Sequence, residues 1–206
     1  MTRPRGRFIT LEGVEGSGKS TLARRLVAAL REQGRTVQLT REPGGTPLAE
    51  SIRSVVLARG AEPMPPSAEM LLMFAARAVH VANFVRPALE RGEWVLCDRF
   101  TDATMAYQGH GRGMDLAQIH QLAHIAHPGL TPDLTLLLDV SPATGMERAR
   151  GRADGGDRFE DEAVAFFERV RTGYLAIAND DPERVRVIDA TPGPDAVLAA
   201  ALQALA

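Results

Sequence analysis

The chain of 206 residues has a single cysteine, Cys97, so no internal disulfide can form. This excludes the disulfide-stapled scaffolds of small secreted proteins and fits a reducing cytosol. The basic N-terminus leads into only about five apolar residues before Glu12, too few for a signal peptide. No run approaches the roughly 20 apolar residues of a membrane span. We therefore expect a cytoplasmic protein with no membrane partner.

Lysine is also almost missing, because the only lysine among the 24 Lys and Arg residues is Lys19. The net charge of −2 gives no general basic surface, which argues against a nucleic-acid partner. Hydrophobic residues make up 45% of the chain and charged residues 24%, which is ordinary globular usage. The length fits one domain, residues 1–206, with a sizeable core.

The one lysine lies in a glycine-rich segment with the spacing of a phosphate-binding loop. A compact ammonium fits between two phosphates, where a planar guanidinium is too wide. The glycines let backbone N–H groups point at an anion, and the following helix adds its positive end. Ser20 is placed to bind Mg²⁺. The predicted ATP-binding residues are Gly13, Val14, Glu15, Gly16, Ser17, Gly18, Lys19, Ser20 and Thr21.

Short apolar runs alternate with segments of helical periodicity along the whole chain. This alternation predicts an α/β protein of three layers, a five-stranded parallel sheet flanked by helices. The segments that follow strands, 12–20, 41–46 and 98–99, then meet at the carboxyl edge of the sheet, where such folds bind ligands. The strands are expected at 8–11, 36–40, 94–97, 134–140 and 185–188, and the helices at 21–33, 48–59, 68–91, 114–126, 161–178 and 196–205.

The class of phosphate-loop protein is narrowed by what the sequence lacks. A guanine-reading N-K-x-D motif cannot occur with Lys19 as the only lysine, and no Asp has a Gly three residues later. A GTPase is therefore excluded, and a small kinase remains. Two alternatives stay open at this point: a kinase for another nucleoside monophosphate, and a non-catalytic switch that binds ATP.

Four segments resemble bacterial thymidylate kinases, in the same order and at similar separations. They are Phe8-Ile9-Thr10-Leu11-Glu12-Gly13, Thr40-Arg41-Glu42-Pro43-Gly44-Gly45-Thr46, Asp98-Arg99-Phe100 and Ala106-Tyr107-Gln108-Gly109. The resemblance runs from about residue 7 to residue 191. It implies a P-loop NTPase-type fold, phosphorylation of dTMP to dTDP with ATP and Mg²⁺ in dTTP biosynthesis, and a homodimer.

The resemblance also implies roles around the transferred phosphoryl group. Arg99 and Arg53 resemble arginines that bind the acceptor phosphate, and Glu42 flanks the acceptor cleft. Asp98 beside Arg99 is implied as a Mg²⁺ ligand, directly or through water. Asp139 also ends a strand and is the rival carboxylate, ranked second because no arginine adjoins it in sequence. Positioning and charge neutralisation are what phosphoryl transfer requires.

Base recognition is implied for the helix at 68–91 and the segment after Asp98. Arg77 resembles an arginine that binds a thymine carbonyl. The family places a stacking Phe four residues earlier; that position is Met73 here, and Phe74 comes one residue later, so either side chain could stack. Thr104 and Gln108 match residues that bind the pyrimidine, and Tyr107 matches the residue that crowds the sugar 2′ position.

A mobile lid is expected at about 148–158, where arginines surround several glycines. Because the phosphate loop contains no Arg, the resemblance implies that the lid supplies the catalytic arginine, Arg150 or Arg152. Arg148 and Thr191 are implied on the ATP side. The five histidines have no accompanying ligand cluster, and with a single cysteine we expect no zinc site.

Overall fold

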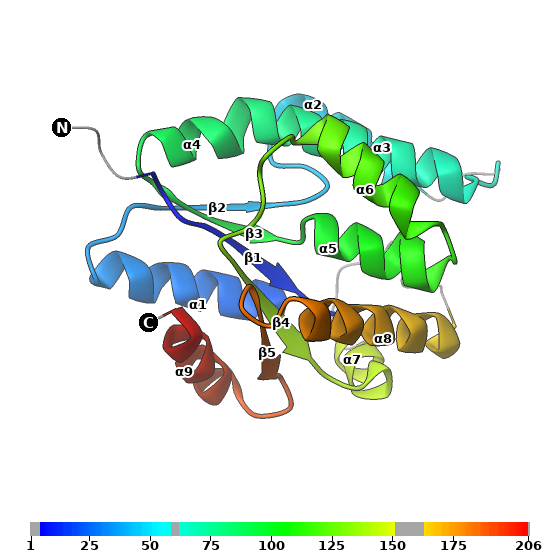
Figure 1. The fold of residues 1–206 in the computed structure, drawn as a ribbon. Helices are drawn as coiled ribbons and strands as arrows, with labels where there is room; N and C mark the ends of the chain where they lie inside the picture. The colour runs from blue at the N-terminus through cyan, green and yellow to red at the C-terminus, as the bar shows by residue number, and fades with distance from the viewer. Residues whose placement is uncertain (1–4, 59–61, 151–162, 206) are drawn as a thin grey trace.

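The computed structural model of the chain describes residues 5–58, 62–150 and 163–205. Five parallel strands form one sheet in the order β2-β3-β1-β4-β5 (Figure 1). This confirms the predicted fold class, and each strand lies within one residue of its expected bounds at either end. The strands are β1 Phe8–Glu12, β2 Val37–Arg41, β3 Trp94–Asp98, β4 Leu134–Asp139 and β5 Val185–Asp189.

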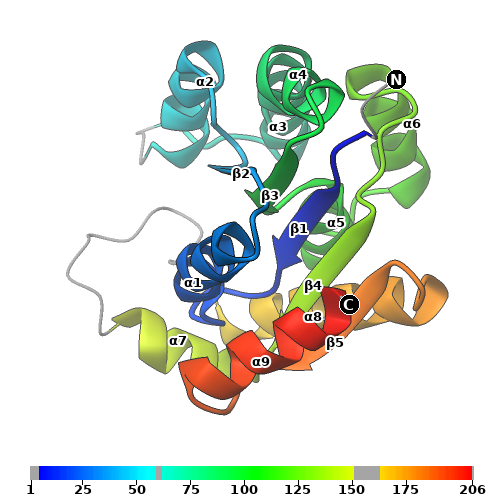
Figure 2. The ribbon, with the colours of Figure 1, turned by 90° about the vertical axis from the view of Figure 1, so that its left-hand side faces the viewer.

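Helices cover both faces of the sheet, as Figure 2 shows from the side. On one face lie α1 (Lys19–Glu32) and α9 (Pro194–Leu205), which pack on each other. The other face carries α4 (Arg86–Glu90), α5 (Thr101–Thr104) and α8 (Val164–Asp180). The remaining helices are α2 (Pro47–Leu57) and α6 (Leu116–Ala126), which pack on α3 (Pro66–His80), and α7 (Pro142–Arg150), which packs on α8.

The core follows from the pattern of apolar residues. Every residue of β1 is buried, as are all but the last of β4, because helices cover both faces of these central strands. Two buried threonines in adjacent strands, Thr10 and Thr135, satisfy each other through a hydrogen bond of 2.7 Å. In α1, the predicted face of Leu22, Leu26, Val27 and Leu30 is the face buried against the sheet.

The order of the strands positions the candidate site. The chain runs from β1 to β2 and β3 on one side of β1, then crosses to β4 and β5 on the other. Ligands of such sheets bind beyond the carboxyl ends of the strands, where this change of direction opens a crevice. The loop after β1 and the residues after β3 both end at this crevice, since Leu11 lies beside Asp98 in the register.

The sequence did not predict two helical segments. Residues 101–111 form α5 and a π-helical continuation, η2 (Met105–Gly111), although threonines and glycines disfavour helix there. Packing of η2 against α8 stabilises this segment. The second segment is α7, which includes Gly145. The expected helix at 68–91 is present as one run, in which a π-helical turn, η1 (Val81–Val85), joins α3 to α4.

The run Pro66–Glu90 has the length and composition of a membrane span, since an 18-residue window within it has a mean hydropathy of 1.3, and it is the only such helix among the described residues. This corrects the expectation that no segment of the chain is long and apolar enough to span a membrane. Two of its polar side chains, Arg77 and His80, are buried and bind Glu42 inside the protein. These interior contacts are those of a core helix.

Candidate active site

Two adjoining cavities open at the carboxyl ends of the strands. The larger measures about 680 Å³ and the smaller about 320 Å³. Gly16, Gly18, Thr21 and Arg148 line both, so the phosphate loop forms part of the boundary between them. Cavities of this size commonly enclose a small ligand. The arrangement therefore offers two binding sites that meet at the loop.

Lys19 is buried in the wall of the larger cavity at the start of α1. Its Nζ donates hydrogen bonds to the carbonyls of Gly13 over 2.9 Å and Val14 over 3.0 Å. Burial, followed by repulsion from Arg99, lowers the pKa of Lys19 to about 8. An anion placed beside Nζ would favour the charged form and reverse this shift.

The phosphate loop rests against α7 through two glycines. Gly16 has a φ of 70°, and a Cβ there would lie 1.8 Å from the carbonyl oxygen of Gly145. A Cβ on Gly145 would lie 2.4 Å from the carbonyl oxygen of Glu15. Neither position can take a larger residue without moving backbone. Of the other predicted loop residues, Glu15, Ser20 and Thr21 line the larger cavity and Ser17 the smaller.

Arg99 is held in an unusual backbone conformation at the end of β3. Its φ of 72° is a left-handed value, which is costly for a residue with a side chain. Its guanidinium donates to Glu15 Oε1 over 2.6 Å, to the Tyr107 hydroxyl over 3.0 Å and to the Tyr174 hydroxyl over 3.2 Å. The strained backbone thus directs a fixed positive charge into the larger cavity, next to Lys19.

Asp98 lines the same cavity, and its Oδ1 is buried without a hydrogen-bond partner among the described residues. A buried carboxylate oxygen without a partner is costly unless something binds it. Ser20 lines the cavity as well. Carboxylate and hydroxyl oxygens are ligands that suit Mg²⁺, so these two residues fit the predicted metal.

The rival carboxylate, Asp139, is occupied by an arginine that is distant in sequence. Arg171 of α8 donates to Oδ1 over 2.7 Å and to Oδ2 over 2.8 Å, a bidentate ion pair. Asp139 does not line either cavity. These contacts favour Asp98 over Asp139 as the metal-side carboxylate.

In the lining of the same cavity, Arg77 forms a buried ion pair with Glu42. Nε of Arg77 donates to Glu42 Oε2 over 2.6 Å, and Nη2 donates to the Phe100 carbonyl and to Thr104 Oγ1. Nη1 is buried and has no partner among the described residues. Arg77 also lines the cavity, and Nη1 is its one buried donor without a partner in the described part of the chain. Arg53 lines it too, and its Nη1 donates to the Pro43 carbonyl over 2.8 Å.

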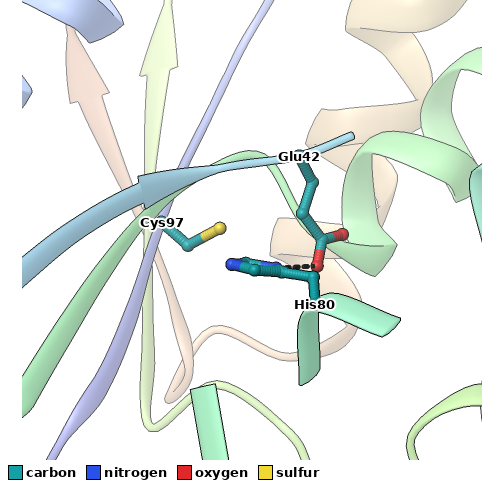
Figure 3. Close-up of side chains that lie close together, drawn as sticks. All are labelled: Glu42, His80 and Cys97. Atoms are coloured by element: carbon teal, nitrogen blue, oxygen red, sulfur yellow. Dashed lines mark hydrogen bonds and ion pairs between the residues drawn. The ribbon is translucent and has the colours of Figure 1, made fainter. Parts of the chain in front are cut away.

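Glu42 also belongs to a buried cluster with His80 and Cys97, drawn in Figure 3. His80 Nδ1 lies 2.8 Å from Glu42 Oε1, and its Nε2 lies 2.8 Å from Thr40 Oγ1. Burial disfavours the charge of Glu42, but Arg77 and His80 outweigh it and hold its pKa below the usual value. Burial raises the pKa of the Cys97 thiol well above its usual value. These groups could surround a metal ion, but hydrogen bonds already satisfy them.

The predicted base-contacting residues divide between the cavity and the core. Thr104, Tyr107 and Gln108 all line the larger cavity. Met73 lines it as well, whereas Phe74 does not and packs in a buried cluster with Met70 and other apolar side chains. Met73 and Phe74 point to different sides of α3, because successive residues of a helix are turned by roughly 100°. The structure thus favours Met73 over Phe74 as the apolar surface that faces a ligand.

The predicted ATP-side residues meet at the smaller cavity. Arg148 of α7 donates to the carbonyl of Ala190 over 2.8 Å and to that of Thr191 over 3.1 Å, and Arg148 and Thr191 both line the cavity. Arg152 and most of the expected lid lie outside the described residues, and the side chain of Arg150 is not described either.

Sequence reasoning missed Glu12, which is buried at the end of β1. Its carboxyl accepts hydrogen bonds of 2.7 Å from the Phe100 backbone N–H and from the Tyr174 hydroxyl. Burial, and then the charge of Asp102, raise the pKa of Glu12 to about 8. A carboxyl at the end of a strand that carries three large apolar residues was the available signal. His80 and Glu69, which bind predicted site residues from behind, were missed because nothing local marks them.

The comparisons with known proteins agree with this geometry. The family model described as thymidylate kinase matches residues 11–200. A thymidylate kinase of Alkalilimnicola ehrlichii is 54% identical over 202 residues, which cover 98% of this chain and 93% of the relative. A thymidylate kinase of Alcanivorax borkumensis is 56% identical over 186 residues, which cover 90% and 89% of the two chains.

The fold is shared as well. The crystal structure of thymidylate kinase from Ehrlichia chaffeensis superposes with a TM-score of 0.80 at 34% sequence identity, covering 98% of this chain and all of that one. Sequence and fold agree over almost the whole length, and the chain therefore belongs to the thymidylate kinase family.

Proposed function

We propose that this chain transfers the γ-phosphoryl group of ATP to dTMP, giving dTDP and ADP, a step of dTTP biosynthesis. The single observation that carries the proposal is the pair of cavities that meet at the phosphate loop, with Lys19 and Arg99 in the lining of the larger one. A kinase needs donor and acceptor sites on either side of fixed positive charge. A switch that only binds ATP has no use for the second, arginine-lined cavity.

ATP is proposed to bind with its nucleoside in the smaller cavity and its phosphates at the phosphate loop. Lys19 and the backbone N–H groups of the loop hold the donor phosphates. Arg148 and Thr191, which are joined across the cavity, border the nucleoside. Binding of the phosphates returns Lys19 to its charged form, since they replace the carbonyls as its partners.

Mg²⁺ is proposed to bind at Ser20 and Asp98. It supplies charge neutralisation for the transferred phosphoryl group when bound. The unpartnered Oδ1 of Asp98 supports this assignment, because a cation or its bound water satisfies that buried atom. Asp139 is paired with Arg171, and its proposed role is structural.

The acceptor phosphate is proposed to bind Arg53 and Arg99. Glu42 is proposed to flank the acceptor cleft, which it lines together with Pro43. Lys19 and Arg99 flank the reacting oxygens and neutralise their charge in the transition state. No general base is required, because the phosphate of a nucleoside monophosphate is already a nucleophile. The lid at 148–158 is proposed to bring a further arginine, Arg150 or Arg152, to the transferred group.

The thymine ring is proposed to lie against Met73 and to be read by Arg77, Thr104 and Gln108. The unused Nη1 donor of Arg77 suits the O4 carbonyl of thymine. Tyr107 is fixed by Arg99 over 3.0 Å, and its rigid ring crowds the position of a sugar 2′-hydroxyl, which favours deoxyribose.

The test is an ADP-release assay with ATP and Mg²⁺ across dTMP, dUMP, dCMP, dGMP and UMP. We expect a strong preference for dTMP. Preference for another monophosphate would retain the kinase and refute the base site. No turnover with any acceptor, together with tight ATP binding, would refute the proposal.

We further propose that the chain forms a homodimer through the side that carries α2, α3 and α6, which lie together in Figure 1. Large apolar side chains are exposed there: Leu48 by 59%, Val55 by 54% and Leu71 by 54%. Exposed apolar groups on adjoining helices are typical of a protein interface. Light scattering should give twice the 22.2 kDa chain mass, and a Leu48→Glu, Leu71→Glu double variant should give the monomer.

We also propose a cytoplasmic location, where ATP is available and Cys97 stays reduced. Fractionation of cells that express the tagged chain tests this, and recovery in the membrane pellet would contradict it.

A further inference from the structure

A buried carboxylate, Glu69 of α3, lies behind the larger cavity and holds the amide of Gln108. Nε2 of Gln108 donates to Glu69 Oε1 over 2.7 Å. Arg112 donates to both oxygens of the same carboxylate, over 3.0 and 3.2 Å. Glu69 and Gln108 are each only 1% exposed. Gln108 lines the cavity and Glu69 does not, so Glu69 acts on a ligand only through Gln108.

The chemistry of this contact fixes which end of the amide faces Glu69. Both oxygens of Glu69 accept from Arg112, and a carboxylate paired in this way can only accept hydrogen bonds. Gln108 must therefore turn its NH₂ group toward Glu69. The two ends of an amide have nearly the same shape, so packing alone does not select between them.

The other end of the amide is available to a ligand. Oε1 of Gln108 accepts no hydrogen bond from the described residues. It is not sealed in the core either, because the buried side-chain atoms without a partner in the described ranges are Arg77 Nη1 and Asp98 Oδ1. The cavity therefore receives a fixed acceptor from Gln108.

We propose that Glu69 is a specificity-determining positioning residue: it holds Gln108 so that Oε1 selects a pyrimidine that carries a hydrogen on N3. Thymine and uracil have an N3–H donor, whereas N3 of cytosine is an acceptor. Against cytosine the two acceptors face each other and both stay unpaired, which costs binding free energy and disfavours cytosine. The inference rests on the proposed base site.

The variant Glu69→Gln tests the proposal, because glutamine can either donate or accept and no longer fixes the amide of Gln108. We expect the ratio of kcat/KM for dTMP to that for dCMP to fall about tenfold or more. The ratio of dTMP to dUMP should stay unchanged, since both bases carry the N3 hydrogen. A residue with only a structural role would move both ratios together or neither.

The control is Asp102→Asn, which makes the same carboxylate-to-amide change in a buried pair with Arg184 that does not line the cavity. Both ratios should stay at the wild-type value in this variant. If Glu69→Gln does not fold, Arg112→Met serves instead. Without the guanidinium that holds both of its oxygens, Glu69 no longer has a fixed position against Gln108, so the dTMP to dCMP ratio should again fall.

Two outcomes would overturn the inference: an unchanged dTMP to dCMP ratio in the folded Glu69 variant, or a parallel fall in both ratios. Failure of the base site itself is distinguished by Gln108→Leu. If that variant keeps the wild-type ratios, Gln108 does not read the base and the proposed site is wrong. If it loses them and Glu69→Gln does not, only the role of Glu69 is refuted.

Discussion

Replacing Glu12 by Gln should make the stability of the protein less dependent on pH. Glu12 is fully buried, and its pKa is raised from 4.5 to about 8. Between these values the folded state keeps a proton that the unfolded state has released, so the free energy of unfolding falls as the pH rises. Gln is neutral at every pH, and its carbonyl can still accept from the Phe100 N–H.

The size of the effect follows from the two pKa values. One pKa unit corresponds to about 1.4 kcal/mol. From 4.5 unfolded and about 8 folded, the wild type should lose about 3 kcal/mol of its free energy of unfolding between about pH 5.5 and about pH 8.5. Other groups titrate in both proteins and cancel in the difference between wild type and variant.

Urea unfolding of both proteins at the two pH values measures this difference. We expect Glu12→Gln to gain on the wild type by roughly 3 kcal/mol as the pH rises across this interval. Glu183→Gln is the control, since that side chain is 92% exposed and should show no such change. A difference between Glu12→Gln and wild type that is the same at both pH values would refute the raised pKa and the buried, protonated carboxyl.

Three further predictions concern the active site. Because the pKa of Lys19 is about 8 in the free protein, ATP binding at about pH 8.5 should take up protons; calorimetry in buffers of different ionisation enthalpy measures this, and no uptake would contradict it. Gly145→Ala should displace the Glu15 carbonyl, which lies 2.4 Å from the added Cβ, and lower kcat/KM for ATP by about tenfold or more; unchanged ATP kinetics would contradict the close packing. Met73→Ala should raise KM for dTMP, whereas Phe74→Ala should mainly lower the free energy of unfolding, by roughly 3 kcal/mol. Steady-state kinetics measures the first effect and urea unfolding the second, and the reverse pattern would show that Phe74 contacts the base.

Local sequence was enough to predict the sheet and the phosphate loop. Strands buried on both faces are mostly apolar, as in Leu134–Asp139, where only Thr135 and the last residue are polar. This pattern can be read from the strand's own residues, without knowing which strands lie beside it. The glycine spacing around Lys19 specifies backbone geometry over a few residues. The helix 101–111 was missed because its threonines and glycines contradict helix propensity, and only packing against α8 stabilises it.

The tertiary structure alone decided which side chains face the cavity and which partners fix them. Glu12 meets Tyr174, Asp139 meets Arg171 and Glu69 meets Gln108 across long stretches of chain. These pairs depend on the order of strands and the phase of helices, and no spacing within one segment encodes them. The same reason separates Met73 from its neighbour, because one step along a helix turns a side chain from the cavity into the core.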